Sequence, residues 1–313
     1  MSRPSSPRIG IALAFACLLL LGAMPLLANA RPGGFDGLTF AVWLTVWQLL
    51  CALPLTLAES CARRAGTGML RRWPPRTAAI ALLTGVIFGL STFMYVVAAE
   101  KAGAVSMVIA LQAYPLFAAL LEAVFLGKRK SPAELFFTLV MLAALVYLTT
   151  AGTFRIAEVS WWSVFALGIP ALWSVAHVLL KQVLVSTPIT PNQVTVSRLV
   201  ISGVFLLIVA AAFGDAGMLL NAAADSAFQQ AAFLMGLAYY LELVLWFYAM
   251  RHIDVSVASS VTVPSPAVTM LLAIFFLGEA IERYQVLAMI VIAAAMYGML
   301  LTGRRKRTRP AAA

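Results

Sequence analysis

Two charged side chains stand inside long apolar stretches of this sequence, and they are the residues best suited to carry chemistry. Arg198 lies about seven residues, and Glu242 about eight, from one end of its apolar stretch, which is a similar depth if both stretches are helices. A charge near the centre of a bilayer costs about 2.5–3.5 kcal/mol, so the pattern favours mutual contact of the two side chains. The sequence leaves open whether they only bridge two helices or also bind a solute or act as a gate.

Aromatic residues accompany one of these charges. Tyr239 and Trp246 lie three residues before and four residues after Glu242, which places all three on one face of a helix. Such a face attracts cationic or amphipathic organic solutes, although aromatic stripes also occur in ordinary packing. Trp173 and His177 repeat the theme with a spacing of four residues. We interpret Trp173 as a further candidate for a solute cavity and His177 as an interfacial side chain rather than a proton relay.

Two other apolar stretches combine a proline with polar side chains on one helix face. Gln112 and Pro115 form one such face, and Thr262 and Pro266 form the other. Proline removes a backbone donor and frees a carbonyl, so Pro115 and Pro266 predict helix bends beside a cavity. Gln112, Thr262 and, from a further stretch, Tyr95 are predicted to line that cavity.

The composition is that of a membrane protein. Hydrophobic residues make up 63% and charged residues 11% of the chain, with a mean hydropathy of +0.96, whereas about a quarter of the residues in a soluble protein are charged. A helix needs about 20 apolar residues to cross a bilayer, and continuous runs of this length differ from the short alternating strands of a barrel. The sequence therefore predicts an all-α integral membrane protein with ten spans. The predicted spans are residues 9–28, 38–58, 77–99, 103–126, 132–151, 160–181, 192–213, 227–250, 254–277 and 283–302.

Basic residues orient the predicted spans. Of the 22 Lys and Arg, 17 fall in loops and tails on one side and four on the other, which predicts cytoplasmic termini and external loops near residues 30 and 220. The positive charge therefore indicates membrane orientation rather than binding to nucleic acid. Residues 28–30 imitate a signal-cleavage site, but the length of the first span favours its retention. We expect a multi-pass protein of the cell (inner) membrane.

The chain contains an internal repeat. A proline and a glycine, at positions 115 and 127, recur 151 positions later in one register, and a second match, at an offset of 150, begins at Thr45. We predict a first five-helix repeat at 1–151, a second at 152–303, and a basic cytoplasmic tail at 304–313. Because five is an odd number, the second copy enters the membrane from the opposite side. Inverted repeats of this kind are typical of secondary transporters.

These residues resemble the EamA-type permeases of the drug/metabolite transporter superfamily. The resemblance rests on a mid-helix proline followed by an apolar run that ends in Leu-Gly-Glu at 277–279, whereas the first copy has Lys128 in place of the Glu. Arg198 matches an arginine in the family's second helix, and Gln48 stands there in the first copy. The resemblance implies two five-helix EamA-like repeats and the export or exchange of small metabolites, such as amino acids, through a central cavity.

Other functions find little support in the sequence. The two histidines lie in different segments and the three cysteines show no metal-ligand spacing, so no catalytic or metal site emerges and we expect the protein not to be an enzyme. We expect no cofactor, because no glycine-rich phosphate loop is present. Expected partners are a small-molecule substrate, the lipid bilayer, and a proton or exchanged solute. The oligomeric state stays open, as do two alternative functions: a flippase for a lipid or lipid-linked substrate and, with less support, a membrane-embedded enzyme.

Overall fold

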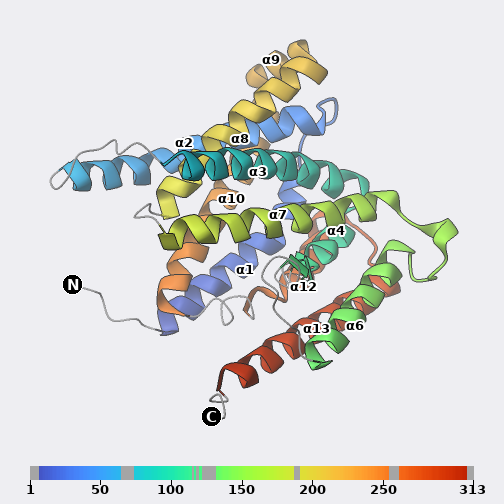
Figure 1. Cartoon of the computed structure of the whole chain (residues 1–313). Coiled ribbons are helices and arrows are strands. Elements are labelled where there is room, and N and C mark those ends of the chain that lie inside the picture. The colour runs from blue at the N-terminus through green and yellow to red at the C-terminus, as the bar shows by residue number, and fades with distance from the viewer. Residues whose placement is uncertain are drawn as a thin grey trace. The chain divides into compact units, whose positions relative to one another are not determined.

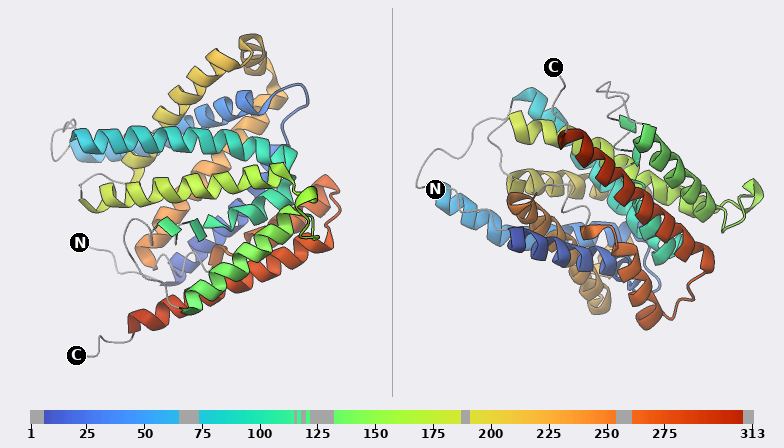
Figure 2. Two further views of the ribbon diagram at one scale, coloured as in Figure 1. Left: turned by 45° about the vertical axis from the view of Figure 1, so that its right-hand side comes forward. Right: turned by 90° about the horizontal axis from the view of Figure 1, so that it is seen from below.

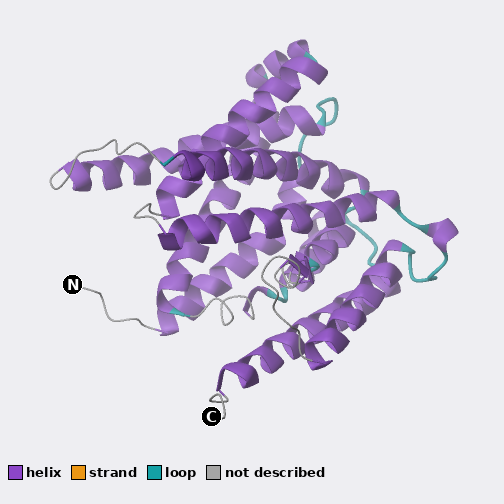
Figure 3. Ribbon diagram, in the orientation of Figure 1, coloured by secondary structure: helices purple, strands orange, loops and turns teal. Residues whose placement is uncertain are grey.

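The structure of this protein is a computed structural model that describes residues 7–64, 74–114, 116–117, 120–121, 132–186, 191–253 and 261–308. Every regular element in these ranges is a helix (Figure 3). The predicted all-α class is thus confirmed for the part of the chain that is described.

Within the described residues, six helices are long and apolar enough to cross a membrane. They are α1 (Pro7–Asn29), α2 (Gly37–Arg64), α3 (Pro75–Lys101), α7 (Trp161–Ser186), α8 (Pro191–Phe213) and α10 (Ser226–His252), labelled in Figure 1. Each overlaps a predicted span, because a continuous apolar run is sufficient to mark such a helix.

The other four predicted spans overlap helices whose described apolar parts are shorter. They are α4 (Ala104–Leu111), α6 (Pro132–Thr149), α12 (Ser265–Leu272) with the π-helical turn η2 (Ala273–Leu277), and α13 (Arg283–Thr308). Residues 122–126 and 254–260, which the prediction assigned to the fourth and ninth spans, lie outside the described residues. The number of ten spans therefore stays a prediction.

A short helix occupies the loop predicted near residue 220. This helix, α9 (Ala216–Ala224), begins where the Asp215 carboxylate accepts the backbone N–H groups of Gly217 and Met218 at 2.7 and 3.2 Å. A side-chain acceptor at this position satisfies donors that the first helical turn leaves free. A further short element, the 3₁₀ turn η1 (Ile156–Glu158), precedes α7.

Two of the apolar segments are interrupted within the membrane-length runs. α4 ends at Leu111 and a turn follows at residues 112–113, while a turn at residues 263–264 directly precedes α12. Pro266 lies in the first turn of α12, where a missing backbone N–H breaks no intrahelical hydrogen bond. The interruption thus precedes Pro266, and Pro115 lies outside the described residues.

The chain divides into two compact units that each draw segments from both halves of the sequence. Unit 1 comprises Met1–Leu26, Ala98–Ser174 and Leu245–Ala313, and unit 2 comprises Leu27–Val97 and Val175–Val244. The unit boundaries therefore run through α1, α3, α7 and α10, and they differ from the boundary between the predicted repeats.

Within unit 2, α2 packs antiparallel against α8. Asn192 at the start of α8 donates to Thr56 Oγ1, near the end of α2, at 3.4 Å. Farther along α8, a Cβ on Gly203 would lie 3.7 Å from Thr45 Cγ2, in the first half of α2. Residues later in α8 therefore contact residues earlier in α2, which is the antiparallel arrangement.

Within unit 1, α6 packs against α13 in the same antiparallel manner, and the two lie side by side in both views of Figure 2. A Cβ on Gly152, just after α6, would lie 2.8 Å from Cβ of Tyr284 at the start of α13. Gly298, late in α13, lies directly against Phe137, early in α6. A third pair in this unit, α4 and α12, is joined at its interruptions, where Gln112 Nε2 donates to Ser265 Oγ at 3.1 Å.

Glu279, the last residue of the Leu-Gly-Glu motif, supports the start of α4. Gly278 ends η2 in the left-handed conformation with φ 63°, and the Glu279 carboxylate accepts a hydrogen bond from the backbone N–H of Ala104. Gly103, which precedes α4, provides no side-chain cap. Glu279 thus supplies an acceptor to a free donor of the first turn of α4. Burial raises the pKa of the Glu279 carboxyl, and the Ala104 hydrogen bond opposes this rise.

We expect Glu279→Ala to lower the thermal midpoint of the detergent-solubilised protein, because a lost helix cap costs about 1 kcal/mol. Glu279→Gln keeps an acceptor for Ala104 and should retain most of the stability. Since the pKa of Glu279 is raised in the folded state, its contribution to stability is present below the unfolded pKa and is lost as the pH rises through the folded pKa. The Gln variant should lack this pH dependence, and equal midpoints for the Ala and Gln variants would exclude the capping role.

Candidate functional site

A buried cluster of charged and aromatic side chains forms inside unit 2. Arg198 of α8 extends over an aromatic ring of α3, with its Cζ 4.0 Å from the centroid of Phe88. The Phe88 ring also lies 5.5 Å from His177 of α7, which is exposed at the edge of the buried cluster. Tyr95 of α3 and Tyr239 of α10 are 6.4 Å apart between ring centroids. Three helices and the second half of α7 therefore contribute to one cluster.

Two opposite charges lie within this cluster. Arg198 is 7% exposed and Glu242, one turn after Tyr239 on α10, is 8% exposed. Their charges attract each other, and the charge of Arg198 also acts on Tyr239. Tyr239 shares a hydrogen bond with the side chain of Thr92 on α3. The structure thus brings together the two charges that the sequence placed at similar depth, whereas a role for them in solute binding stays a prediction.

Glycines of α3 allow α8 to approach closely enough for this contact. A Cβ on Gly85 would lie 2.6 Å from Ile201 Cβ, and one on Gly89 would lie 2.8 Å from Phe205 Cδ1. Ser202 Oγ donates to the carbonyl of Gly85 at 2.7 Å. Small residues let membrane helices pack backbone to backbone, and Arg198, one turn before Ser202, consequently reaches the ring of Phe88.

Four of the predicted cavity residues lie in unit 1 and not in this cluster. Trp246 packs in a small apolar group with Ala14 and Ala249, so the structure gives it a packing role between α1 and the end of α10. Gln112 donates to Ser265 at the interruption of α4, as described above. The remaining two, Trp173 on α7 and Thr262 just before the turn at 263–264, are half-buried.

The sequence candidates omitted Phe88, which carries the cation–π contact. A signal for it was present in the repeat. At an offset of 151 residues, Phe88, Ser91 and Tyr95 of α3 correspond to the acidic and aromatic face of α10. The equivalents on that face are Tyr239, Glu242 and Trp246, respectively. The equivalence indicates that both halves present an aromatic face, one neutral and one acidic.

Comparison with known proteins finds a family match in the second half of the chain. Residues 160–301 match the EamA-like transporter family, which belongs to the drug/metabolite transporter superfamily. Residues 160–301 are an EamA-like transporter domain. The resemblance inferred from the sequence is thereby confirmed for residues 160–301, and the apolar helices together with this match indicate a multi-pass membrane protein. The EamA-like range includes Arg198, Tyr239 and Glu242, whereas Phe88 and Tyr95 precede it. No curated protein matches the chain.

Solved structures share the fold of this EamA-like protein. Among 28 matching chains, one described only as "Crystal structure of protein" has a TM-score of 0.65 and 18% sequence identity. The match covers 96% of this chain and 100% of that one. At such low identity the likeness shows the fold alone.

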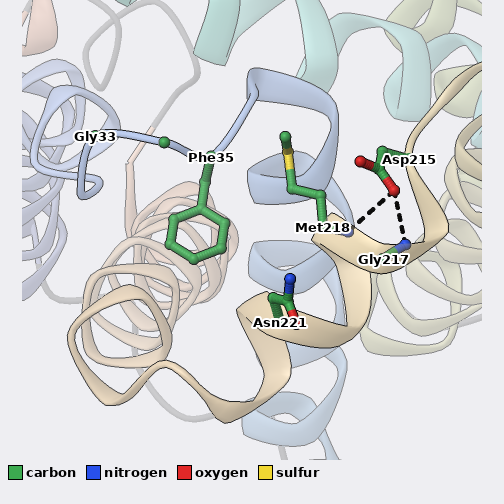
Figure 4. A pocket seen from close by; sticks show the side chains of 7 residues that line it. Gly33, Phe35, Asp215, Gly217, Met218 and Asn221 are labelled. Carbon is green, nitrogen blue, oxygen red and sulfur yellow. Dashed lines mark hydrogen bonds between the residues drawn. The ribbon is translucent and has the colours of Figure 1, made fainter.

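A separate cavity of about 350 Å³ lies in unit 2 of the EamA-like protein, between the segment before α2 and the start of α9 (Figure 4). Its lining includes Gly33, Phe35 and Asn221. The Asp215 carboxylate, also at this cavity, is occupied by the hydrogen bonds that begin α9. None of the predicted site residues lines it, so it does not serve as the candidate site. The described residues also contain no group of three His, Cys, Asp or Glu that could hold a metal ion.

Proposed function

We propose that this EamA-like protein is a secondary transporter that moves a small polar or amphipathic metabolite, such as an amino acid or a related compound, outward across the cell membrane. The observation that carries the proposal is the buried cluster of Arg198, Glu242, Tyr239 and Phe88 in a member of a transporter family. Charges inside a membrane are expensive and mark substrate or ion pathways. The proposed substrate is this metabolite, the proposed direction is outward, and the proposed coupling partner is a proton or an exchanged solute.

Helix packing supports two inverted five-helix repeats, 1–151 and 152–303. The packed pairs α2 with α8 and α6 with α13 each join segments that are equivalent at an offset of about 150 residues. The pairs α2 with α8 and α6 with α13 run antiparallel. A two-fold axis in the membrane plane relates inverted repeats, and equivalent helices next to such an axis pack antiparallel. This relation also accounts for compact units that mix both halves of the sequence.

The cluster has the chemistry to hold a solute with charges of both signs. Glu242 attracts a cationic group, and the rings of Tyr95 and Tyr239 provide faces for apolar or cationic parts. Arg198 offers donors to an anionic group. Alternating access would expose this cluster to one side of the membrane at a time, coupled to a proton or an exchanged solute.

The proposed topology can be tested with reporter fusions. We expect a C-terminal fusion to report the cytoplasm and fusions near residues 30 and 220 to report the outside, because basic residues favour the cytoplasmic side. A C-terminal reporter that is active only outside the cell membrane would contradict ten spans with both termini inside.

The transport proposal is tested by reconstituting the protein into liposomes. Labelled amino acids, nucleobases and organic cations are offered as solutes, and a labelled lipid is offered in parallel. Movement of at least one small solute is the expected result. Movement of lipid without any small solute would replace the proposal with the flippase function, and movement of neither would refute transport of these classes.

A further inference from the structure

Two buried hydrogen-bond donors near the proposed site have no acceptor among the described residues. One is Nε of Arg198, and the other is Nε2 of Gln48 on α2. Gln48 is 1% exposed and Arg198 is 7% exposed, so bulk solvent does not reach these groups. A buried donor without an acceptor is destabilising, and proteins contain few of them. Two such donors at related positions therefore call for a ligand that supplies the acceptors.

Gln48 and Arg198 occupy equivalent positions. They are 150 residues apart, and each directly precedes a leucine, Leu49 or Leu199, in the apolar group at which α2 and α8 meet. The ring beneath Arg198 belongs to Phe88, and the residue equivalent to Phe88 at the offset of 151 is Tyr239 on α10.

The backbone around Gln48 packs in the corresponding way. A Cβ on Gly236 of α10 would lie 3.1 Å from the Gln48 backbone N and 2.8 Å from the carbonyl oxygen of Leu44. Gly236 is itself equivalent to Gly85, the residue of α3 at which α8 approaches. α2 thus lies against α10 near Gln48, as α8 lies against α3 near Arg198.

Polar neighbours of Gln48 on α2 are satisfied within unit 2. Thr45 Oγ1 donates to the carbonyl of Ala41 at 2.7 Å, and Trp47 Nε1 donates to Gln229 Oε1 at 2.8 Å. Gln48 differs from both of these neighbours because its amide nitrogen has no such acceptor.

We propose that Gln48 is a second anchor for the transported solute and that its Nε2 donates to an acceptor oxygen of a carboxylate on that solute. The inference rests on the proposed transport function. Nε of Arg198 and Nε2 of Gln48 both lack acceptors among the described residues, and a carboxylate has the oxygen acceptors that such donors need. Glu242 then receives the cationic group of the same solute. Gln48 in the first half of the chain and Arg198 in the second half would then both donate to the solute carboxylate.

The test measures flux in liposomes for wild type, Gln48→Leu and Gln48→Glu. Each amino acid of the panel is paired with its decarboxylated amine, so that a pair differs in the carboxylate. Thr45→Val is the matched control, because Thr45 lies one turn away on the same helix and its hydroxyl bonds only within the helix.

Gln48→Leu should raise KM for the transported amino acid about tenfold, the effect of one lost hydrogen bond to a charged group. It should leave KM for the amine unchanged and should keep or raise the thermal midpoint, since the unpaired donor is removed. Gln48→Glu should raise KM for the amino acid further through charge repulsion. Thr45→Val should change neither KM.

If wild type moves amino acids and Gln48→Leu leaves their KM unchanged, the role of Gln48 is refuted and the transport function stands. An equal rise of KM for acid and amine, or a lowered thermal midpoint, shows a packing role and also refutes the anchor. If wild type moves no member of the panel, the proposed function and this inference fail together.

Discussion

Replacing Glu242 by glutamine should reduce solute flux per folded protein about 100-fold, because loss of one partner of a buried, interacting charge pair costs about 2–5 kcal/mol. The substitution keeps the shape of the side chain and an oxygen acceptor, while it removes the charge that attracts a cationic group. Glu242 is 8% exposed and its charge interacts with that of Arg198. Flux is measured in liposomes with the solute found for the wild type, and the folded fraction is measured by size-exclusion chromatography in detergent.

Glu100→Gln is a matched control for this experiment. Glu100 lies at the end of α3 beside Lys101, with a side chain that is 35% exposed and an Nζ to Oε1 distance of 2.8 Å. Exposed ion pairs contribute little, so this variant should transport like wild type. Unchanged flux in Glu242→Gln would remove Glu242 from the site, although the fold and the family would stand.

The second large effect concerns the stability of the buried charge pair. Arg198→Met or Glu242→Leu alone should lower the free energy of unfolding by about 3–5 kcal/mol, because each leaves the opposite charge buried without its partner. The double variant removes both charges and should lose less than the sum of the single variants, by at least about 1 kcal/mol. Thermal unfolding in detergent, followed for the four proteins of this double-mutant cycle, provides the measurement.

A second cycle controls for non-specific effects. Gln229 lies about 20 Å before Glu242 along α10, where it bonds Trp47 and the carbonyl of Ala222. Combining Gln229→Leu with Arg198→Met should give additive losses, since distant sites act independently. Additive losses in the Arg198 and Glu242 cycle as well would show that these two charges are not coupled.

Hydropathy and charge located most of the helices because a bilayer imposes its requirement on each segment separately. A span must be long and apolar, so the ends of α1, α8 and α10 fall close to the predicted limits. The same requirement makes Arg198 and Glu242 conspicuous in the sequence, and helical rise along each span indicates their depth. The Leu-Gly-Glu motif and Arg198 indicated the EamA-like family, which the match over residues 160–301 confirms.

Patterns of hydropathy and charge did not predict which helices pack against each other. Depth predicts that Arg198 and Glu242 can meet, but the close approach at Gly85 and Gly89 decides that Arg198 lies over Phe88. Helix spacing placed Trp246 beside Glu242 on one face of α10, yet Trp246 packs with Ala14 in unit 1.

The sequence by itself determined the helical class, the long apolar helices, the two charges within them and the EamA-like match over residues 160–301. Each of these depends on the length, composition or motif of one segment. The tertiary structure alone decided which equivalent helices pair, where α4 and α12 are interrupted, and that the Gln48 and Arg198 donors lack acceptors. These features depend on how each helix is rotated and on which helix it packs against. Close packing between segments more than a hundred residues apart sets both, and no local pattern encodes them.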